Sequence, residues 1–131
     1  MTVAKKGFEL AEQLNAEVAL VYVVDLSIAI RSYDIVNVNL EFFIKESINA
    51  LKKEVENSLD KMIQTYAKGK EVVKFMPEGF PRESIINTSE QWNADLIVIG
   101  LHGKSGIGIF VMGSISQYIS LYSKVPVMIV Q

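Results

Sequence analysis

The chain has 131 residues, half of them hydrophobic and 21% charged, which is typical of one globular domain over residues 1–131 and excludes disordered and fibrous classes. Thirteen Lys and Arg against fifteen Asp and Glu give a net charge of −2, which argues against non-specific binding to nucleic acid. The absence of cysteine excludes disulfides and thiolate chemistry, and a single histidine, His102, excludes His-rich zinc clusters.

Hydrophobic spacing in the first third of the chain predicts a helix followed by a strand. Apolar residues at helical intervals predict an amphipathic helix from Thr2 to Leu14, which ends at Asn15. The apolar, β-branched run Glu17–Val24 predicts a strand buried on both faces of a parallel sheet. Residues 26–39 have no clear period, and we predict a loop or lid there.

A long amphipathic helix follows and ends near Gly69. Its apolar residues step by threes and fours along a single stripe: Leu40, Ile44, Ile48, Leu51, Val55, Leu59, Met62 and Tyr66. Such a stripe is more typical of a helix face that packs on a core than of a cofactor site.

The second half of the chain continues the alternation of strands and helices. The predicted elements are a strand Glu71–Met76, a helix from Pro81 to about Trp92, a strand Asp95–Gly100, a helix from Ser114 to about Ser123, and a strand Pro126–Val130. The helix from Pro81 is expected to bury Ile85, Ile86 and Trp92. This order predicts an α/β fold, an open parallel sheet with helices on both faces.

A glycine-rich loop, residues 100–113, follows one of these strands at the edge where open α/β sheets bind ligands. At Gly113–Ser114 the chain enters a helix, whose free N–H groups and dipole favour an anion such as phosphate. Neither the Walker A pattern nor the dinucleotide pattern G-x-G-x-x-G is present. The residues alone therefore leave two interpretations, a phosphate-binding loop or a strand–helix connection whose glycines serve packing.

The spacing Gly100-x2-Gly103-x9-Gly113-Ser114 resembles the nucleotide-binding signature of the universal stress protein family. The surrounding residues are similar to that family too: 93–106, 112–116, 125–130, the strand end Tyr22–Asp25 and the Gly-x-Pro helix start at 79–81. The resemblance implies the adenine nucleotide alpha hydrolase-like fold of universal stress proteins.

The same resemblance implies ATP as the cofactor, with or without Mg²⁺. The matching binding positions are Val23, Ile99, Gly100, His102, Gly103, Gly113, Ser114, Ile115 and Ser116. Val23 and Ile99 would border the adenine or sugar, and the others the phosphates and ribose. For His102, a backbone N–H to phosphate is favoured over a general base, because no acidic neighbour in sequence orients the imidazole. Lys104 is favoured as a solvated cation over a phosphate clamp.

One feature of the family has no counterpart ahead of Thr2: a first strand of the form I-L-V-x-x-D-x-S, whose Asp faces the nucleotide. In the family this strand lies between those that match Glu17–Val24 and Asp95–Gly100. We therefore expect these two strands either to pair directly or to accept a strand from elsewhere. We also expect ATP binding by the chain itself to be weak or absent.

The function that the resemblance implies is a nucleotide-binding module of the stress response. It would act through binding and homodimerisation along Pro126–Val130, an apolar edge strand, with no catalytic residues and no metal ligands of its own. The alternatives are a slow ATP hydrolase that acts as a switch and an interaction protein with an empty site. No apolar stretch approaches the ~18 residues of a membrane helix, and the start does not resemble a signal peptide, so we expect a cytoplasmic protein.

Overall fold

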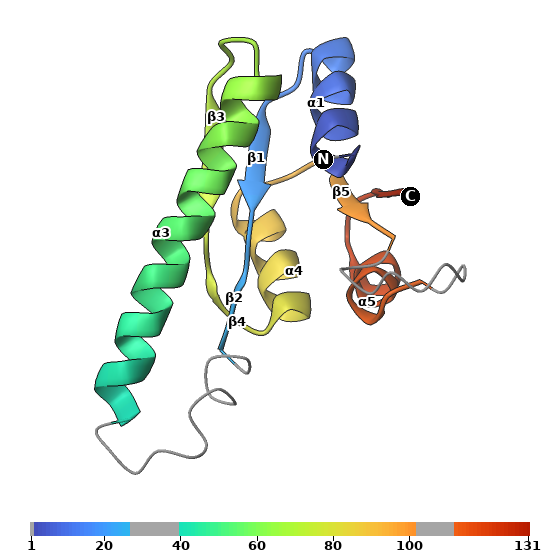
Figure 1. The fold of residues 1–131 in the computed structure, drawn as a ribbon. Coiled ribbons are helices and arrows are strands. Elements are labelled where there is room, and N and C mark those ends of the chain that lie inside the picture. The colour runs from blue at the N-terminus through green and yellow to red at the C-terminus, as the bar shows by residue number, and fades with distance from the viewer. Residues whose placement is uncertain (1, 27–39, 102–111) are drawn as a thin grey trace.

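Helices and strands alternate along the computed structural model, which describes residues 2–26, 40–101 and 112–131 (Figure 1). Their order is α1 (Thr2–Leu14), β1 (Val18–Val21), β2 (Val24–Asp25), α3 (Leu40–Tyr66), β3 (Val72–Phe75), β4 (Glu78–Gly79), α4 (Pro81–Gln91), β5 (Ile97–Gly100), α5 (Ser114–Tyr122) and β6 (Val127–Val130). The predicted α/β order is confirmed. The loop or lid predicted at 26–39 lies outside the described residues, apart from Leu26.

Local backbone chemistry sets several of these boundaries. α1 ends where Asn15 adopts a positive φ of 50°, a conformation that asparagine tolerates better than most residues. α4 begins with Pro81 in its first turn, where the missing N–H costs no helical hydrogen bond. Just before it, Gly79 has a φ of 149°, and a Cβ there would lie 2.9 Å from Ser84 Oγ. Only glycine fits that turn without strain.

The strands form three parallel pairs instead of one continuous sheet. β1 pairs with β3 with Val18 opposite Val72, β2 pairs with β4, and β5 pairs with β6 with Ile97 opposite Val127. Within residues 2–26, 40–101 and 112–131, no ladder joins β1 to β5. The parallel arrangement is confirmed, but the direct pairing of these two strands, one of our two expectations, is not found.

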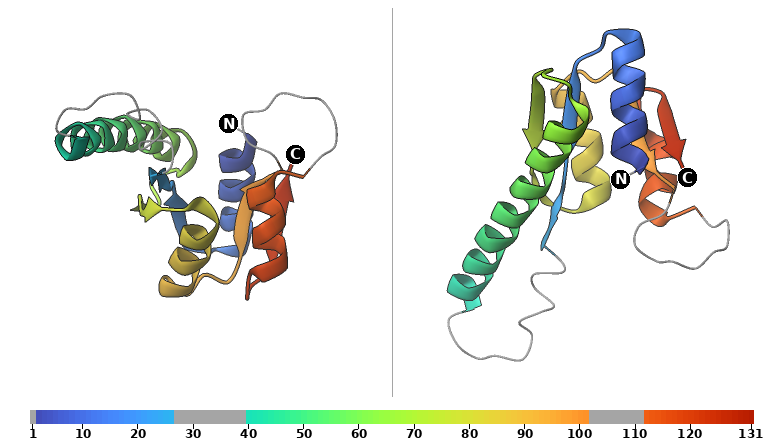
Figure 2. Two further views of the ribbon diagram at one scale, coloured as in Figure 1. Left: turned by 90° about the horizontal axis from the view of Figure 1, so that it is seen from below. Right: turned by 45° about the horizontal axis from the view of Figure 1, so that its top comes forward.

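Two adjoining cavities of about 400 and 330 Å³ occupy the space between β1 and β5. Both are lined by Ala19 and Leu20 of β1 and by Leu96 and Val98 at β5, and we call this space the interstrand cleft. Figure 2 shows α1 and α3 on one side of the strands and α4 and α5 on the other.

The strands are less buried than their apolar sequences predict. Of the described strand residues, Val24 is fully buried and Ile97 is 9% exposed, whereas Val21 and Met128 are each 40% exposed. The prediction that Ile85, Ile86 and Trp92 are buried is also wrong. All three are half-buried, and the buried residue of α4 is Thr88. Ile85 and Trp92 line the interstrand cleft, which leaves their side chains accessible.

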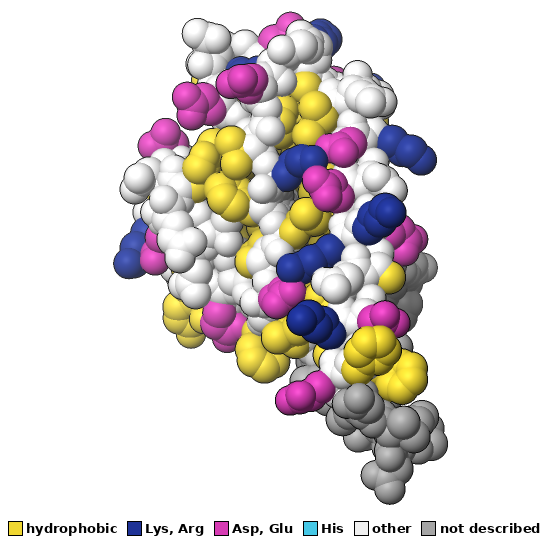
Figure 3. Space-filling view, turned by 90° about the vertical axis from the view of Figure 1, so that its left-hand side faces the viewer, with side chains coloured by type: hydrophobic (Ala, Val, Ile, Leu, Met, Phe, Trp, Pro, Cys, Tyr) yellow, Lys and Arg dark blue, Asp and Glu magenta, His cyan; other side chains and the backbone are white. Residues whose placement is uncertain are grey.

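The apolar stripe of α3 contacts the core over its C-terminal half. Val55 and Leu59 are buried there. A cluster around Phe8 of α1 is contacted by three later residues of α3: Met62, Ile63 and Tyr66. Ile44 and Ile48 are only half-buried, because the N-terminal half of α3 extends beyond the strands (Figure 1). Figure 3 shows Lys, Asp and Glu side chains interspersed on the outer face of the molecule formed by α3 and β3.

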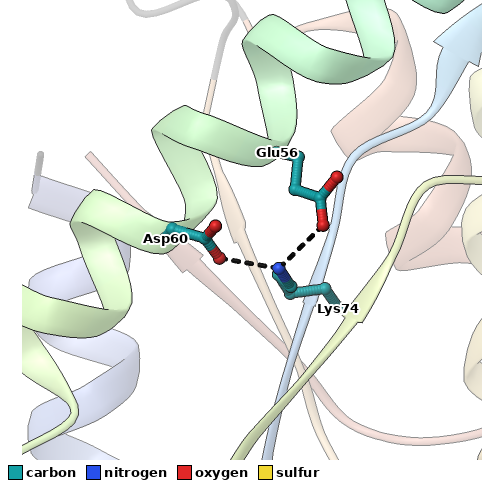
Figure 4. Close-up of polar contacts among 3 residues, drawn as sticks. All are labelled: Glu56, Asp60 and Lys74. Carbon is teal, nitrogen blue, oxygen red and sulfur yellow. Dashed lines mark hydrogen bonds and ion pairs between the residues drawn. The ribbon is translucent and has the colours of Figure 1, made fainter.

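An ion-pair cluster joins β3 to α3 on that face (Figure 4). Lys74 Nζ lies 2.6 Å from Asp60 Oδ1 and 3.1 Å from Glu56 Oε1, two carboxylates one helical turn apart. The hydrogen bond to Asp60, followed by that to Glu56, raises the pKa of Lys74 above its ordinary value. Because the pKa is raised on folding, the stability it contributes is present at neutral pH and lost as the pH rises through that pKa.

Candidate functional site

The carboxyl end of β5 meets the N-terminus of α5, where the sequence predicts a phosphate-binding loop. The two ends of that loop are joined at the Leu101 carbonyl, which accepts the Gly113 N–H at 2.9 Å and the Ser116 hydroxyl at 2.7 Å. Ser116 Oγ also lies 3.0 Å from the Gly113 carbonyl, so its single proton is shared between two acceptors. These contacts fix the start of α5 against the end of β5.

The N-terminus of α5 presents backbone N–H groups that no helical carbonyl accepts. Gly113 is the N-cap, with an extended backbone (φ −62°, ψ 154°), and the first helical bond runs from Gln117 N–H to its carbonyl at 3.0 Å. The N–H groups of Ser114, Ile115 and Ser116 precede that bond and point outward along the helix axis. Together with the helix dipole they favour an anion.

The side chains at the start of α5 differ in their exposure to solvent. Ser114 and Ile115 are exposed, and Ser114 makes no side-chain hydrogen bond to another described residue. Ser116 is 3% exposed, and its hydroxyl is used within the fold. Ser114 is thus a surface residue at the start of α5, whereas the buried Ser116 hydroxyl holds Leu101 and Gly113 together.

The structure brings together most of the predicted binding positions that it describes. Ile99 and Gly100, both half-buried, end β5 beside the α5 N-terminus, and Ile99 also lines the interstrand cleft. Val23, also half-buried, follows β1 on the other side of that cleft. His102, Gly103 and Lys104 lie outside the described residues.

Sequence reasoning did not identify the role of Leu101. A backbone carbonyl as the common acceptor for two loop ends has no residue-type signature, so no pattern in the sequence pointed to it. The described residues contain no cluster of three or more His, Asp or Glu side chains suited to a metal ion. In the same part of the chain, no helix has the length and apolarity to cross a membrane.

Comparison with known proteins shows which family the chain resembles. The model of the universal stress protein family matches residues 1–131. The chain is 31% identical over 133 residues to universal stress protein MJ0531 of Methanocaldococcus jannaschii, covering 98% of this chain and 72% of that protein.

Two solved structures share the fold. Universal stress protein UspA from Lactobacillus plantarum superposes with a TM-score of 0.82 at 19% identity, over 98% of this chain and 87% of that one. A universal stress protein solved in complex with cAMP has a TM-score of 0.57 at 18% identity, over 98% of this chain and 84% of that one.

Proposed function

Since the chain belongs to the universal stress protein family, we propose that it binds an adenine nucleotide, ATP, at the carboxyl end of β5. It acts in the stress response as a cytoplasmic homodimer that signals through binding and not through catalysis. The observation that carries this proposal is the junction at Leu101, which sets the outward N–H groups of α5 beside the end of β5. A related fold solved with cAMP supports an adenine nucleotide as the ligand class.

In this proposal the phosphates lie at the start of α5. The N–H groups of Ser114, Ile115 and Ser116 donate to phosphate oxygens, and the exposed Ser114 hydroxyl adds a further donor. Gly113 lets the ligand approach the backbone, since any Cβ there would lie next to the same N–H groups. Its own N–H is engaged by Leu101, so it contributes space and not a hydrogen bond.

The remaining positions border the rest of the nucleotide. Ile99 and Gly100 would lie beside the sugar, and Val23, between β1 and β2, would border the adenine. His102 and Gly103 remain phosphate-side positions in this proposal, as the family resemblance implies. With no metal-binding cluster among the described residues, an accompanying Mg²⁺ would be held chiefly by the phosphates.

The dimer of this proposal forms along the outer edge of β6. Ile97 N–H donates to the Pro126 carbonyl and Leu101 N–H to the Val130 carbonyl, so alternate residues of β6 face β5. The backbone groups of Val127 and Ile129 therefore face away from β5 and can pair with a second copy.

Calorimetry with ATP and with adenosine tests the nucleotide proposal. ATP should bind saturably and adenosine at least about tenfold more weakly. Adenosine lacks the phosphates, whose negative charge the N–H groups at the N-terminus of α5 favour. Because we expect the chain to bind ATP weakly at best, the titration extends to millimolar ATP. Absence of binding there would refute the nucleotide function and favour the alternative, an interaction protein with an empty site. Equal affinity for adenosine would refute the placement of the phosphates at α5.

A further inference from the structure

The second half of α5 presents apolar side chains to solvent as well as to the core. Ser116 and Ile119 are buried and define the core side of the helix. Leu121 and Tyr122 are 69% and 62% exposed. Residues three and four apart share a helix face, so Tyr118 lies on the same side of α5 as these two. A helix that only covers strands has a polar outer face, so packing within the chain does not explain this apolar side of α5.

The rings of Tyr118 and Tyr122 form a continuous aromatic surface. Their centroids lie 4.6 Å apart, with the ring planes tilted by 42°. Because the two rings are in contact, a ligand has to lie across their outer faces and not between them. Neither phenol hydroxyl forms a hydrogen bond with another described residue, so both can donate to a second molecule.

A cation lies over this aromatic surface. α4 and α5 pack side by side (Figure 2), and Cζ of Arg82, in the first turn of α4, lies 5.1 Å from the centroid of the Tyr118 ring. Arg82 is exposed and forms no ion pair with the other described residues, unlike Lys124, whose Nζ lies 3.2 Å from Glu90 Oε1. The guanidinium can therefore bind a carboxylate of a second molecule through two parallel N–H groups. We call Arg82, Tyr118, Leu121 and Tyr122 the α5 outer patch.

The chemistry of the α5 outer patch selects its occupant. Tyrosine and arginine are the residue types that most often dominate the binding energy of protein interfaces. A single unpaired cation on a chain of net charge −2 does not suit nucleic acid or an anionic membrane, which bind through several cations. The patch spans about two helical turns, which gives a partner helix few anchors. A polyproline II segment needs an exposed aromatic surface and donors for its free carbonyls, and the two tyrosines supply both.

We propose that the α5 outer patch docks a proline-rich polyproline II segment of another protein, which carries a Glu or Asp whose carboxylate pairs with Arg82. The prolines lie across the Tyr118 and Tyr122 rings, and an apolar side chain of the segment contacts Leu121. At ~1.5 Å per residue, Tyr122 lies about 12 Å along α5 from Ser114. The docking surface is therefore separate from the proposed phosphate positions.

A synthetic peptide, acetyl-Pro-Pro-Leu-Pro-Glu-Leu-Pro-Pro, tests the proposal, and its control carries Gln in place of Glu. Fluorescence anisotropy of the labelled peptides, without nucleotide, measures their affinity for the wild type, Arg82→Gln, Tyr122→Ala and Phe42→Ala. Phe42 is 54% exposed on α3, so Phe42→Ala is the matched control for the loss of an exposed aromatic ring. Light scattering of each protein without peptide measures its mass.

The Glu peptide should bind the wild type saturably, and Tyr122→Ala should weaken this binding by about tenfold or more, whereas Phe42→Ala should not change it. Arg82→Gln should weaken binding of the Glu peptide by about fivefold and leave that of the Gln peptide unchanged, because the loss belongs to the ion pair.

Equal binding of the two peptides by the wild type, or no binding at millimolar peptide, would overturn the proposal. A mass above that of a dimer, which Tyr122→Ala reduced, would assign the α5 outer patch to a second copy of the chain and overturn it too. No readout depends on nucleotide, so the result stands apart from that of the ATP experiment.

Discussion

The β1–β3 and β5–β6 pairs are alike in length and direction but are held by different interactions. β1–β3 lies against the hydrophobic cluster of Ala4, Phe8 and Ala67, with Val18, Leu20 and Val72 packed around it, and Lys74 ties β3 to α3. β5–β6 has Ile97 as its buried strand residue, and its far end is organised by hydrogen bonds at Leu101. The first pair is a packed scaffold, and the second carries the candidate site.

This difference predicts that stability and ligand binding can be separated by mutation. Substitutions around the β1–β3 pair should change the free energy of unfolding, and those around Leu101 should change nucleotide affinity.

The largest effect is expected from Phe8→Ala. Phe8 is 6% exposed and its ring stacks on Tyr66 with centroids 6.1 Å apart, so truncation should cost about 3–5 kcal/mol in the free energy of unfolding. Phe80→Ala is the matched control, because Phe80 is 65% exposed and its loss should change stability by less than about 0.5 kcal/mol. Urea denaturation measures both, and similar losses in the two variants would contradict the scaffold assignment.

Gly113→Val should abolish ATP binding while the fold is kept. The φ of −62° at Gly113 suits valine, so the backbone is not strained, but the branched side chain would occupy the space next to the N–H groups of α5. Calorimetry measures the affinity, and circular dichroism with urea denaturation checks the fold. Equal affinity for the wild type and the variant would show that the phosphates lie elsewhere.

Ile129→Lys should shift a dimer toward the monomer or aggregates, because a charge on the outer edge of β6 opposes strand pairing. Val73→Lys is its control on the other pair, since Val73 is 44% exposed in β3, and it should leave the mass unchanged. Light scattering at micromolar concentration measures both. A monomer mass for the wild type would refute the dimer proposal.

Ser114→Ala and Ser116→Ala should separate direct contact from positioning. Loss of the exposed Ser114 hydroxyl should weaken ATP binding by ~1 kcal/mol, about fivefold, with stability unchanged. Loss of the buried Ser116 hydroxyl should reduce the free energy of unfolding by about 1 kcal/mol, since it removes a bond to Leu101. Calorimetry and urea denaturation together distinguish the two, and a reversed pattern would contradict the assigned roles.

The smallest effect is expected from Lys74→Met, a fall in Tm within about 2 °C at neutral pH. Because the pKa of Lys74 is raised, the difference from wild type should disappear at strongly alkaline pH, where the lysine is neutral. Lys68→Met, which removes an exposed single ion pair to Glu12, should change Tm still less. A loss of stability at Lys74 that persisted unchanged at high pH would show that packing, and not charge, was responsible.

The sequence predicted much of the fold because its local signals agree with the tertiary structure. The bounds of α1 are those predicted, Thr2–Leu14, and Pro81 and Ser114 start α4 and α5 as predicted. Burial was predicted less well, since an apolar run such as that of β5 indicates a strand but not whether a neighbour pairs with its second edge. The interstrand cleft lies where β1 and β5 are not paired, and local sequence patterns do not reveal which distant strands pair.

For the site, glycine spacing located Gly113 and Ser114 but not how they are held. The hydroxyl of Ser116 is directed to the Leu101 carbonyl, an acceptor that every residue carries and that no pattern distinguishes. Its position in the fold, and not its residue type, gives Leu101 its role.

Amide chemical shifts during an ATP titration test the nucleotide site most directly, because they detect weak as well as tight binding. Saturable shifts should be largest at the α5 start and the end of β5, at Ser114, Ile115, Ser116 and Gly100, with a smaller shift at Val23 and the amides of β3 unchanged. Shifts centred on the β1–β3 pair, or none at millimolar ATP, would contradict the assignment of the nucleotide site to the β5–β6 half of the molecule.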